Sequence, residues 1–264
     1  MTQISLKAAK QSAAIVGALL LAPVVIATGG ALASHATATI NGEVNPAKLP
    51  ADRRVAATLS VGAEVSADPG KEFEPVDQIK LDAGRNLKVN LGAVPRCSAD
   101  LTDTTAAEAE AACGPSRVSV DPASSAVIDL SGPGGNFSTT LPLKIFNGPG
   151  NSQVRVWIRS DPLDRTFVLT AAVSQAPEAP LARAASRGAE RKWGPRLTLP
   201  APQFDDGTLG PYSLRGIHLG VKVDKGRFVT ANCEAANQRF RAIVTYKSVH
   251  PADIVTDSDP CRRR

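Results

Sequence analysis

The sequence predicts an all-β fold, an antiparallel β-sandwich with one short helix that a disulfide brackets. Apolar and polar residues alternate in segment after segment of the 264-residue chain, which is the pattern of strands with one buried face. Clusters of Gly, Pro, Asn and Asp separate these segments and favour turns. One alanine-rich stretch has helical character, and it lies between two cysteines.

The alternating segments are frequent enough to build two sheets. Between Val55 and Val65 every second residue is apolar, and the residues between them include Thr58, Ser60 and Glu64. The same period recurs at 87–91, 137–145, 154–158, 167–173, 217–223 and 240–246. Strands that are apolar on one side only form antiparallel sheets with one face in solvent.

Turn-forming residues divide the middle of the chain. From Ala126 to Ser174, strands are separated by such residues at 131–135, 147–151 and 161–164, which predicts a four-stranded meander. Two sheets packed face to face would bury the alternating apolar residues. A closed barrel fits the same pattern, but the uneven turn spacing and the long Pro-rich segments favour the sandwich.

The short helix is expected over Asp103–Ala112. Its alanines and glutamates favour helix, and Asp103 or Thr104 can cap its first turn. A helix of this length is unstable alone in water. Because Cys97 and Cys113 bracket the segment, we expect a helical excursion that a disulfide holds at both ends.

Residues 1–33 are predicted to be a secretory signal peptide. Lys7 and Lys10 precede an apolar run from Ala13 to Ala33 that ends in small residues. Cleavage after Ala33 fits this pattern, and cleavage after Ala38 fits it as well. The expected location of the remaining chain is therefore outside the cell, secreted or at the cell surface.

The same apolar run has a second interpretation as a retained membrane anchor, because about 20 apolar residues suffice to cross a bilayer. Pro23 and the pair Gly29-Gly30 would interrupt a helix across the membrane. This favours cleavage, after which we expect no permanent membrane span.

The charge of the chain excludes one class of partner. The formal charge is +5, and removal of Lys7 and Lys10 with the signal leaves 28 basic and 25 acidic residues, a net charge of +3. So small an excess produces no long-range field of the kind that nucleic-acid-binding proteins use. We expect no nucleic-acid partner, which leaves an extracellular protein, a glycan or another component of the cell envelope.

Four cysteines in an exported chain predict two disulfides, because thiols are not kept reduced outside the cytosol. Sequence alone permits three pairings. We favour Cys97 with Cys113 and Cys233 with Cys261, since each pair closes a short local loop. No C-x-x-C arrangement with a nearby histidine occurs, so we expect neither a metal bound by the cysteines nor a cofactor.

Residues 34–264 are expected to form a single β-sandwich domain. Between 175 and 212 the alternation gives way to Pro, Ala, Arg and Gly, which predicts a long crossing loop or a linker. The part after Tyr212 is too short to bury a core easily by itself. We expect its strands to return to the first sheet, and a two-domain arrangement stays open.

Five residues are candidates for surface contacts: Trp157, Arg183, Arg187, Arg191 and Trp193. Trp157 lies on the polar side of its strand, where it is either a contact residue or, as we favour, covered by the Pro-rich segment. The three arginines repeat at helical spacing beside Trp193. They form either a basic stripe for phosphate or acidic polysaccharide or, as we favour, a solvated face.

The sequence contains no familiar catalytic motif. It has no G-x-S-x-G, no H-E-x-x-H, no phosphate-binding Gly-rich loop and no EF-hand loop. His218 and His250 are candidate bases, and acidic clusters at 205–206 and 253–259 are candidate calcium ligands or glycosidase carboxylates. Acidic residues in such loops mostly form turns.

Two paired-cysteine segments resemble those of uncharacterised secreted actinobacterial proteins. The first consists of Val94–Ser98 and Ala112–Val118, where a Pro-x-Cys precedes a short helix and a second Cys leads into the next strand. The second consists of Phe228–Cys233 with the late Cys261. The resemblance implies an exported bacterial β-rich protein with local disulfides, and it implies no activity and no site residues.

These observations favour a non-enzymatic secreted or cell-surface protein, an extracellular interaction or structural module. Two alternatives stay open. One is a secreted hydrolase with an unrecognised site, and the other is a β-sandwich that binds calcium or a glycan.

Overall fold

The computed structural model describes residues 36–67, 76–120, 123–132, 135–160, 164–177, 193–201, 213–247 and 252–263. The expected signal peptide at 1–33 and the candidate contact residues Arg183, Arg187 and Arg191 lie outside these ranges. Within these ranges, no helix combines the length and the apolar character that crossing a lipid bilayer requires.

The described chain consists mainly of strands, with three short helices. In chain order the elements are β1 (Ala36–Asn45), β2 (Lys48–Leu49), β3 (Val55–Ala56), β4 (Thr58–Ala67), β5 (Val76–Gly84), β6 (Leu87–Val89), η1 (Leu91–Ala93), α1 (Ala106–Cys113), η2 (Gly114–Ser116), β7 (Ser125–Gly132), β8 (Gly135–Asn147), β9 (Gln153–Ser160), β10 (Arg165–Gln175), β11 (Trp193–Pro200), β12 (Ser213–Val223), β13 (Val229–Ala231), β14 (Asn237–Tyr246), β15 (Asp253–Pro260) and β16 (Arg262–Arg263).

Eleven of the described strands form one antiparallel sheet in the order β1-β4-β12-β7-β8-β9-β10-β11-β5-β14-β15. The meander predicted from Ala126 to Ser174 is confirmed as β7-β8-β9-β10. Strand β12 pairs with β4 on one side and β7 on the other, so the last strands return to the first part of the sheet, as expected.

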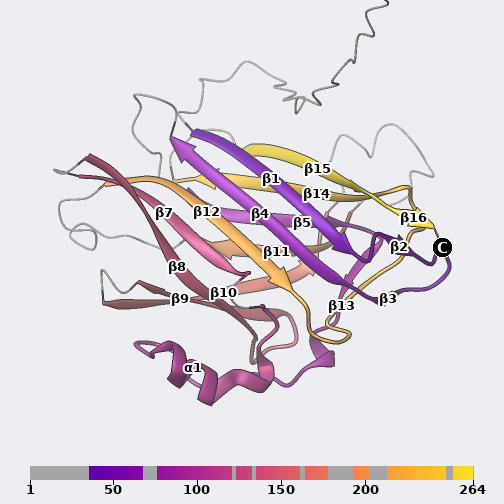
Figure 1. Cartoon of the computed structure of the whole chain (residues 1–264), viewed down its shortest axis with the longest axis horizontal. Helices are drawn as coiled ribbons and strands as arrows, with labels where there is room; N and C mark the ends of the chain where they lie inside the picture. The colour runs from indigo at the N-terminus through magenta and orange to yellow at the C-terminus, as the bar shows by residue number, and fades with distance from the viewer. Residues whose placement is uncertain are drawn as a thin grey trace, which may run out of the picture. The chain divides into compact units, whose positions relative to one another are not determined.

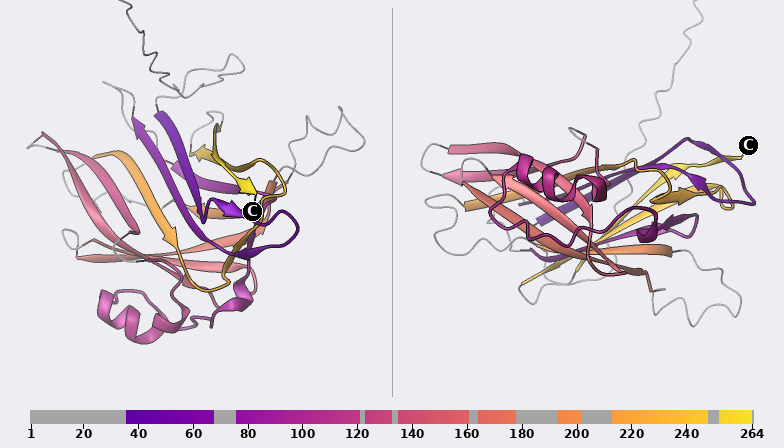
Figure 2. Two further views of the ribbon diagram at one scale, coloured as in Figure 1. Left: turned by 45° about the vertical axis from the view of Figure 1, so that its right-hand side comes forward. Right: turned by 90° about the horizontal axis from the view of Figure 1, so that it is seen from below.

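The sheet curls until its two halves face each other across one apolar core (Figure 1 and Figure 2). Side chains from both halves, such as Leu59 on β4, Val156 on β9 and Phe240 on β14, meet in the same hydrophobic cluster. The predicted all-β, antiparallel fold is confirmed, and its two facing layers belong to one continuous sheet. Strand twist accumulates across many paired strands and allows this closure.

The two edge strands, β1 and β15, lie against each other without a ladder of backbone pairs between them. Instead, the backbone N–H of Gly42 donates to Asp257 Oδ2 at 2.9 Å, and that of Val44 donates to Asp259 Oδ2 at 3.0 Å. A Cβ atom at Gly42 would overlap the ring of Phe240, so glycine permits the close approach. We call this contact between β1 and β15 the seam.

Strand β16 and a disulfide hold one end of the seam in place. Strand β16 pairs in parallel with β2, and the disulfide between Cys233 and Cys261 joins the segment before β14 to the end of β15. Both disulfides pair as the sequence analysis favoured, Cys97 with Cys113 and Cys233 with Cys261.

Part of the Pro-rich segment is a strand, which corrects the expectation of a loop or linker over 175–212. Strand β11 lies inside the sheet between β10 and β5. Its register with β5 shifts between Trp193 and Arg196, where Pro195 has no backbone N–H to pair and Gly194 passes close to the backbone of Gly84. Because of its prolines, the sequence did not indicate this strand, although it contains a short apolar–polar alternation in which Leu197 faces the core.

Helix α1 begins later than the sequence indicated. Asp103 adopts a φ of 56° outside the helix, and Thr105 is the N-cap, with its hydroxyl accepting from the backbone N–H of Glu108. The Glu108 side chain accepts from the N–H of Thr105 in return, which completes a capping box. The predicted helix between Cys97 and Cys113 is confirmed.

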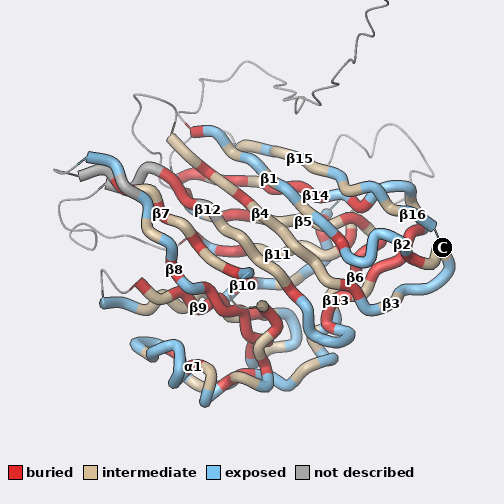
Figure 3. Tube along the Cα trace, viewed as in Figure 1, coloured by how far each residue is buried: buried red, intermediate tan, exposed pale blue. Residues whose placement is uncertain are grey.

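Trp157 is not a surface contact residue. Its side chain is fully buried in a cluster with Phe146 of β8 and with Leu101 and Ala109 of the helical excursion. The indole Nε1–H donates to Thr104 Oγ1 at 3.1 Å. The residue is therefore covered, and among the described residues the cover comes from the disulfide-bracketed segment with α1, where we expected the Pro-rich segment. Figure 3 shows α1 beside β8 and β9, the strands that contribute to this cluster.

The cover over Trp157 gives a fluorescence prediction. In a Trp193→Phe variant, where Trp157 is the remaining tryptophan, we expect blue-shifted emission that iodide quenches poorly. Adding Cys97→Ser and Cys113→Ser removes a loop constraint of about 3 kcal/mol, so the cover opens more often and quenching increases. The matched control adds Cys233→Ser and Cys261→Ser instead. Equal quenching in the two double-serine variants would contradict this account.

Candidate functional site

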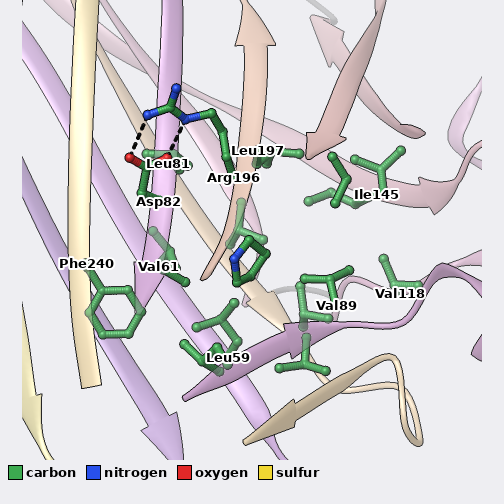
Figure 4. Close-up of a pocket in the computed structure, with 18 of the residues that line it drawn as sticks. Leu59, Val61, Leu81, Asp82, Val89, Val118, Ile145, Arg196, Leu197 and Phe240 are labelled. Carbon is green, nitrogen blue, oxygen red and sulfur yellow. Dashed lines mark hydrogen bonds and ion pairs between the residues drawn. The ribbon is translucent and has the colours of Figure 1, made fainter. Parts of the chain in front are cut away.

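A cavity of about 130 Å³ lies between the two halves of the sheet. Figure 4 shows side chains from different strands around this space, among them Val61 of β4, Val89 of β6 and Leu197 of β11. The complete lining is Ile40, Leu59, Val61, Leu81, Asp82, Ala83, Leu87, Val89, Val118, Ile145, Val154, Val173, Pro195, Arg196, Leu197, Val221, Val223, Phe228, Val229 and Phe240.

The aliphatic side chains around the cavity are under-packed. Ile40, Leu59, Val61, Leu81 and Val221 all point to the inside of the sheet, yet each is only partly buried. Protein interiors are ordinarily packed as densely as organic crystals, with few voids larger than a water molecule. A dry cavity of about 150 Å³ with a similar lining binds benzene in another protein. This cavity is therefore large enough for a small apolar group.

Two charged residues belong to the lining, but their charged groups bond to each other. Because side chains alternate along a strand, Leu81 and Ala83 of β5 face the cavity and Asp82 faces the opposite side of the sheet. On β11 the same alternation directs Leu197 inward and Arg196 outward. Figure 4 shows the ion pair between Asp82 and Arg196 beside the cavity.

Asp82 is the centre of a buried ion cluster on three neighbouring strands. Its carboxylate accepts from Arg196 Nε at 2.6 Å and Nη2 at 2.8 Å, and from Arg241 Nε at 2.8 Å. The Asp82 side chain is fully buried, whereas the two arginine side chains keep 12% and 10% of their exposure. The guanidinium of Arg241 stacks on the Trp193 ring, 4.2 Å from its centroid. We call these four residues the Asp82 cluster.

A polar groove of about 620 Å³ adjoins the cavity. Four residues, Leu87, Val89, Val173 and Pro195, line both spaces and form a rim between them. The remaining groove residues are Arg54, Arg85, Lys88, Asn90, Leu91, Gly92, Asn151, Ser174, Gln175, Trp193 and Gly194. Cavity and groove are therefore neighbouring spaces, one apolar and the other polar.

The groove carries positive charge. Its lining contains Arg54, Arg85 and Lys88 and no acidic residue. Arg54 Nη2 donates to the carbonyl of Arg85 at 2.9 Å, which holds two of these cations together. Arg85 forms an ion pair with Glu234 at 3.5 Å, and the Glu234 side chain is half exposed.

One buried amide organises the segment beside the groove. Asn147 is fully buried at the end of β8, and its Nδ2 donates to the carbonyls of Leu91, Val94 and Pro95 at 2.8, 2.9 and 3.1 Å. These three bonds attach the segment that begins with η1 to the sheet. Leu91 in turn lines the groove.

The candidate residues from the sequence are distributed unevenly over this site. Trp193 lines the groove and is half buried, with one ring face against Arg241. Trp157 is buried under α1 and lines neither space. His250 and the acidic pair at 205–206 lie outside the described residues, and His218 is on β12.

The acidic residues at 253–259 have structural partners. Asp257 and Asp259 accept the seam hydrogen bonds, and Asp253 Oδ2 accepts from the hydroxyl of Tyr246 at 2.5 Å. Across the described residues, no group of three or more His, Cys, Asp or Glu side chains is arranged to hold a metal ion. In this part of the chain the calcium hypothesis gains no support.

Among the described residues, two carboxyl groups have displaced pKa values, and both belong to the excursion that carries α1. The backbone N–H of Thr105, followed by its hydroxyl, lowers the pKa of Glu108. Hydrogen bonds from Thr102 lower the pKa of Asp100. Neither residue lines the cavity or the groove, so these shifts reflect local capping of an exposed segment.

Sequence reasoning missed the cavity and the groove. A signal for the cavity exists in the composition, because the chain has only 7 Phe, 2 Trp and 2 Tyr among 264 residues. Small aliphatic side chains fill a wide curled sheet less completely than aromatic ones. The groove carries no comparable signal, since Arg54, Lys88 and Gln175 come together only in the fold.

No protein-family model, no curated protein and no solved structure matches this chain.

The Asp82 cluster gives a stability prediction. Asp82→Asn leaves two buried guanidinium groups without their anion, so we expect the free energy of unfolding to fall by about 3 kcal/mol or more. The matched control is Asp164→Asn, which removes one ion-pair partner of Arg159 at a position that is 90% exposed, and which we expect to cost less than about 1 kcal/mol. Urea denaturation measures both, and equal losses would contradict the prediction.

Proposed function

We propose that this protein is a non-catalytic binding protein that works outside the cell, secreted or at its surface, and holds a small apolar ligand in the cavity. The observation that carries the proposal is the lining of the cavity. Several of its inward-facing aliphatic side chains, such as Leu59, Val61 and Val221, are only partly buried, although they lie between two layers of one sheet.

The chemistry of the lining supports binding over hydrolysis. The described residues around the cavity include no Ser, His or Cys, and their two charged side chains form an ion pair with each other. Such a space offers apolar contact and shape but no nucleophile and no proton acceptor for a reaction. The hydrolase alternative therefore has less support than the binding function.

The extracellular setting is a separate part of the proposal. Two disulfides support an oxidising compartment, and the N-terminal pattern of a basic start and an apolar run supports export. A ligand of the cell envelope or of the surrounding medium fits both that setting and an apolar cavity.

Benzene is a suitable first probe of the cavity. We expect it to raise the melting temperature, because a ligand that binds only the folded state adds about 2.7 kcal/mol of stability at 100 times its Kd. Val221→Phe and the milder Val221→Leu should reduce or abolish this rise by filling the cavity. Circular dichroism melts with and without benzene measure the effect.

The matched control for the larger substitution is Ile254→Phe, which adds an aromatic ring at a residue that is 62% exposed. We expect it to keep the benzene response of the parent protein. A benzene response that persists in Val221→Phe, or that is absent from the parent protein, would overturn the proposed function.

A further inference from the structure

We propose that the cavity and the groove together bind a short anionic amphiphile, with its alkyl chain in the cavity and its carboxylate or phosphate in the groove. This inference rests on the proposed function and specifies the chemical class of its ligand. The observation behind it is that an apolar cavity lies next to a cationic groove. The cavity is unsuited to the charged headgroup, and the groove is unsuited to the alkyl chain.

The rim residues define where the chain of the ligand would leave the cavity. Leu87 and Val89 of β6, Val173 of β10 and Pro195 of β11 border both spaces. All four are apolar, so an alkyl chain that passes from the cavity to the groove stays in contact with apolar surface. The headgroup then lies in the groove, whose lining includes the exposed residue Lys88.

The charges of the groove select the sign of the headgroup. Arg54, Arg85 and Lys88 line it without an acidic residue among the other lining positions. Guanidinium groups bind carboxylates and phosphates through paired hydrogen bonds, and an ammonium adds a compact positive charge. A neutral headgroup would gain little here, and a cationic one would be repelled.

The Asp82 cluster adds a further positive charge beside the groove. Arg196 and Arg241 share the single carboxylate of Asp82, so the cluster carries a net charge of +1. Trp193 connects the two features, because its ring stacks on Arg241 and also lines the groove. A partly buried charge is screened less by salt than an exposed one, so the cluster strengthens the attraction for an anion.

The cavity disfavours a charged headgroup, whereas the groove favours one. A charged group inside an apolar cavity lacks the hydrogen bonds it had in water and is driven out. Conversely, an alkyl chain on the polar groove would stay in contact with water and gain little. A divided ligand satisfies both spaces at once.

The test compares three compounds that share one chain: octanoate, octyl phosphate and 1-octanol. Isothermal titration calorimetry on the purified protein gives each affinity at low salt and at about 1 M salt. At low salt we expect the anions to bind about tenfold or more tightly than 1-octanol, because hydrogen bonds to charged groups are strong. At high salt we expect this preference to shrink.

Two further comparisons identify the source of the headgroup and the role of the chain. A preference between octanoate and octyl phosphate distinguishes a fatty acid from a lipid phosphate. Acetate and inorganic phosphate carry the headgroup without the chain, and we expect them to bind far more weakly. Binding of these two ions as tight as that of the octyl anions would overturn the proposal of a joined site.

Single-charge variants localise the headgroup. Lys88→Gln and Arg54→Gln should each weaken octanoate binding about three- to tenfold and leave 1-octanol binding unchanged. The matched control is Lys247→Gln, which removes a positive charge from an exposed residue just after β14. Lys247 follows the end of β14 that pairs with Val76, whereas the other end pairs beside Gly84 and the groove. We expect no change in octanoate affinity there.

The outcomes separate this inference from the function on which it rests. Equal affinities for octanoate and 1-octanol, both abolished by Val221→Phe, would overturn the anionic headgroup and leave the apolar site intact. Octanoate binding that survives Val221→Phe unchanged would overturn the placement of the chain in the cavity. If benzene does not raise the melting temperature of the parent protein, the proposed function itself fails.

Discussion

The architecture depends on how one sheet closes without a last pair of hydrogen-bonded strands. At the seam, Asp257 and Asp259 of β15 accept from the backbone of Gly42 and Val44 on β1, so carboxylates occupy the place of strand carbonyls. Exposed strand edges invite pairing with other chains, and charged side chains that point at an edge block it. The seam therefore satisfies two backbone N–H groups on the edge of β1 and covers the edge of β15, and it fixes the distance between the two halves of the sheet that enclose the core.

That distance explains the cavity. Once the edges meet, the interior volume follows from the number and tilt of the strands, whereas the filling follows from the side chains. Residues such as Ile40, Val61 and Val221, which lie on neighbouring strands of one wall, are too small to reach the opposite wall, and Phe228 and Phe240 fill only part of the space. Closing the gap would require either larger side chains or a narrower sheet, and the seam prevents the second.

The sequence predicted features that depend on neighbours in the chain, and it missed those that depend on distant strands. Local loops identified both cysteine pairs, and alternation with turns identified the meander from β7 to β10. The sequence did not predict strand β11, because its prolines outweigh a short alternation. It did not predict the cover over Trp157, because that cover comes from a segment about fifty residues earlier in the chain. The cavity and groove join side chains from Ile40 to Phe240, and no periodicity encodes such a meeting or the volume left over.

The Asp82 cluster shows how charge keeps the cavity apolar. On β5 and β11 a slip of one residue would exchange the two faces of each strand and move Asp82 and Arg196 into the cavity, with Leu81 and Leu197 turned outward. Charges in that apolar space would lose their solvation, and the pairing of Asp82 with both Arg196 and Arg241 would be broken. We infer that the cluster matters more for the register of β11, β5 and β14 than for stability alone. By fixing that register, the Asp82 cluster keeps the aliphatic face of these strands toward the cavity. Their opposite face then carries the positive charge of the cluster next to the groove.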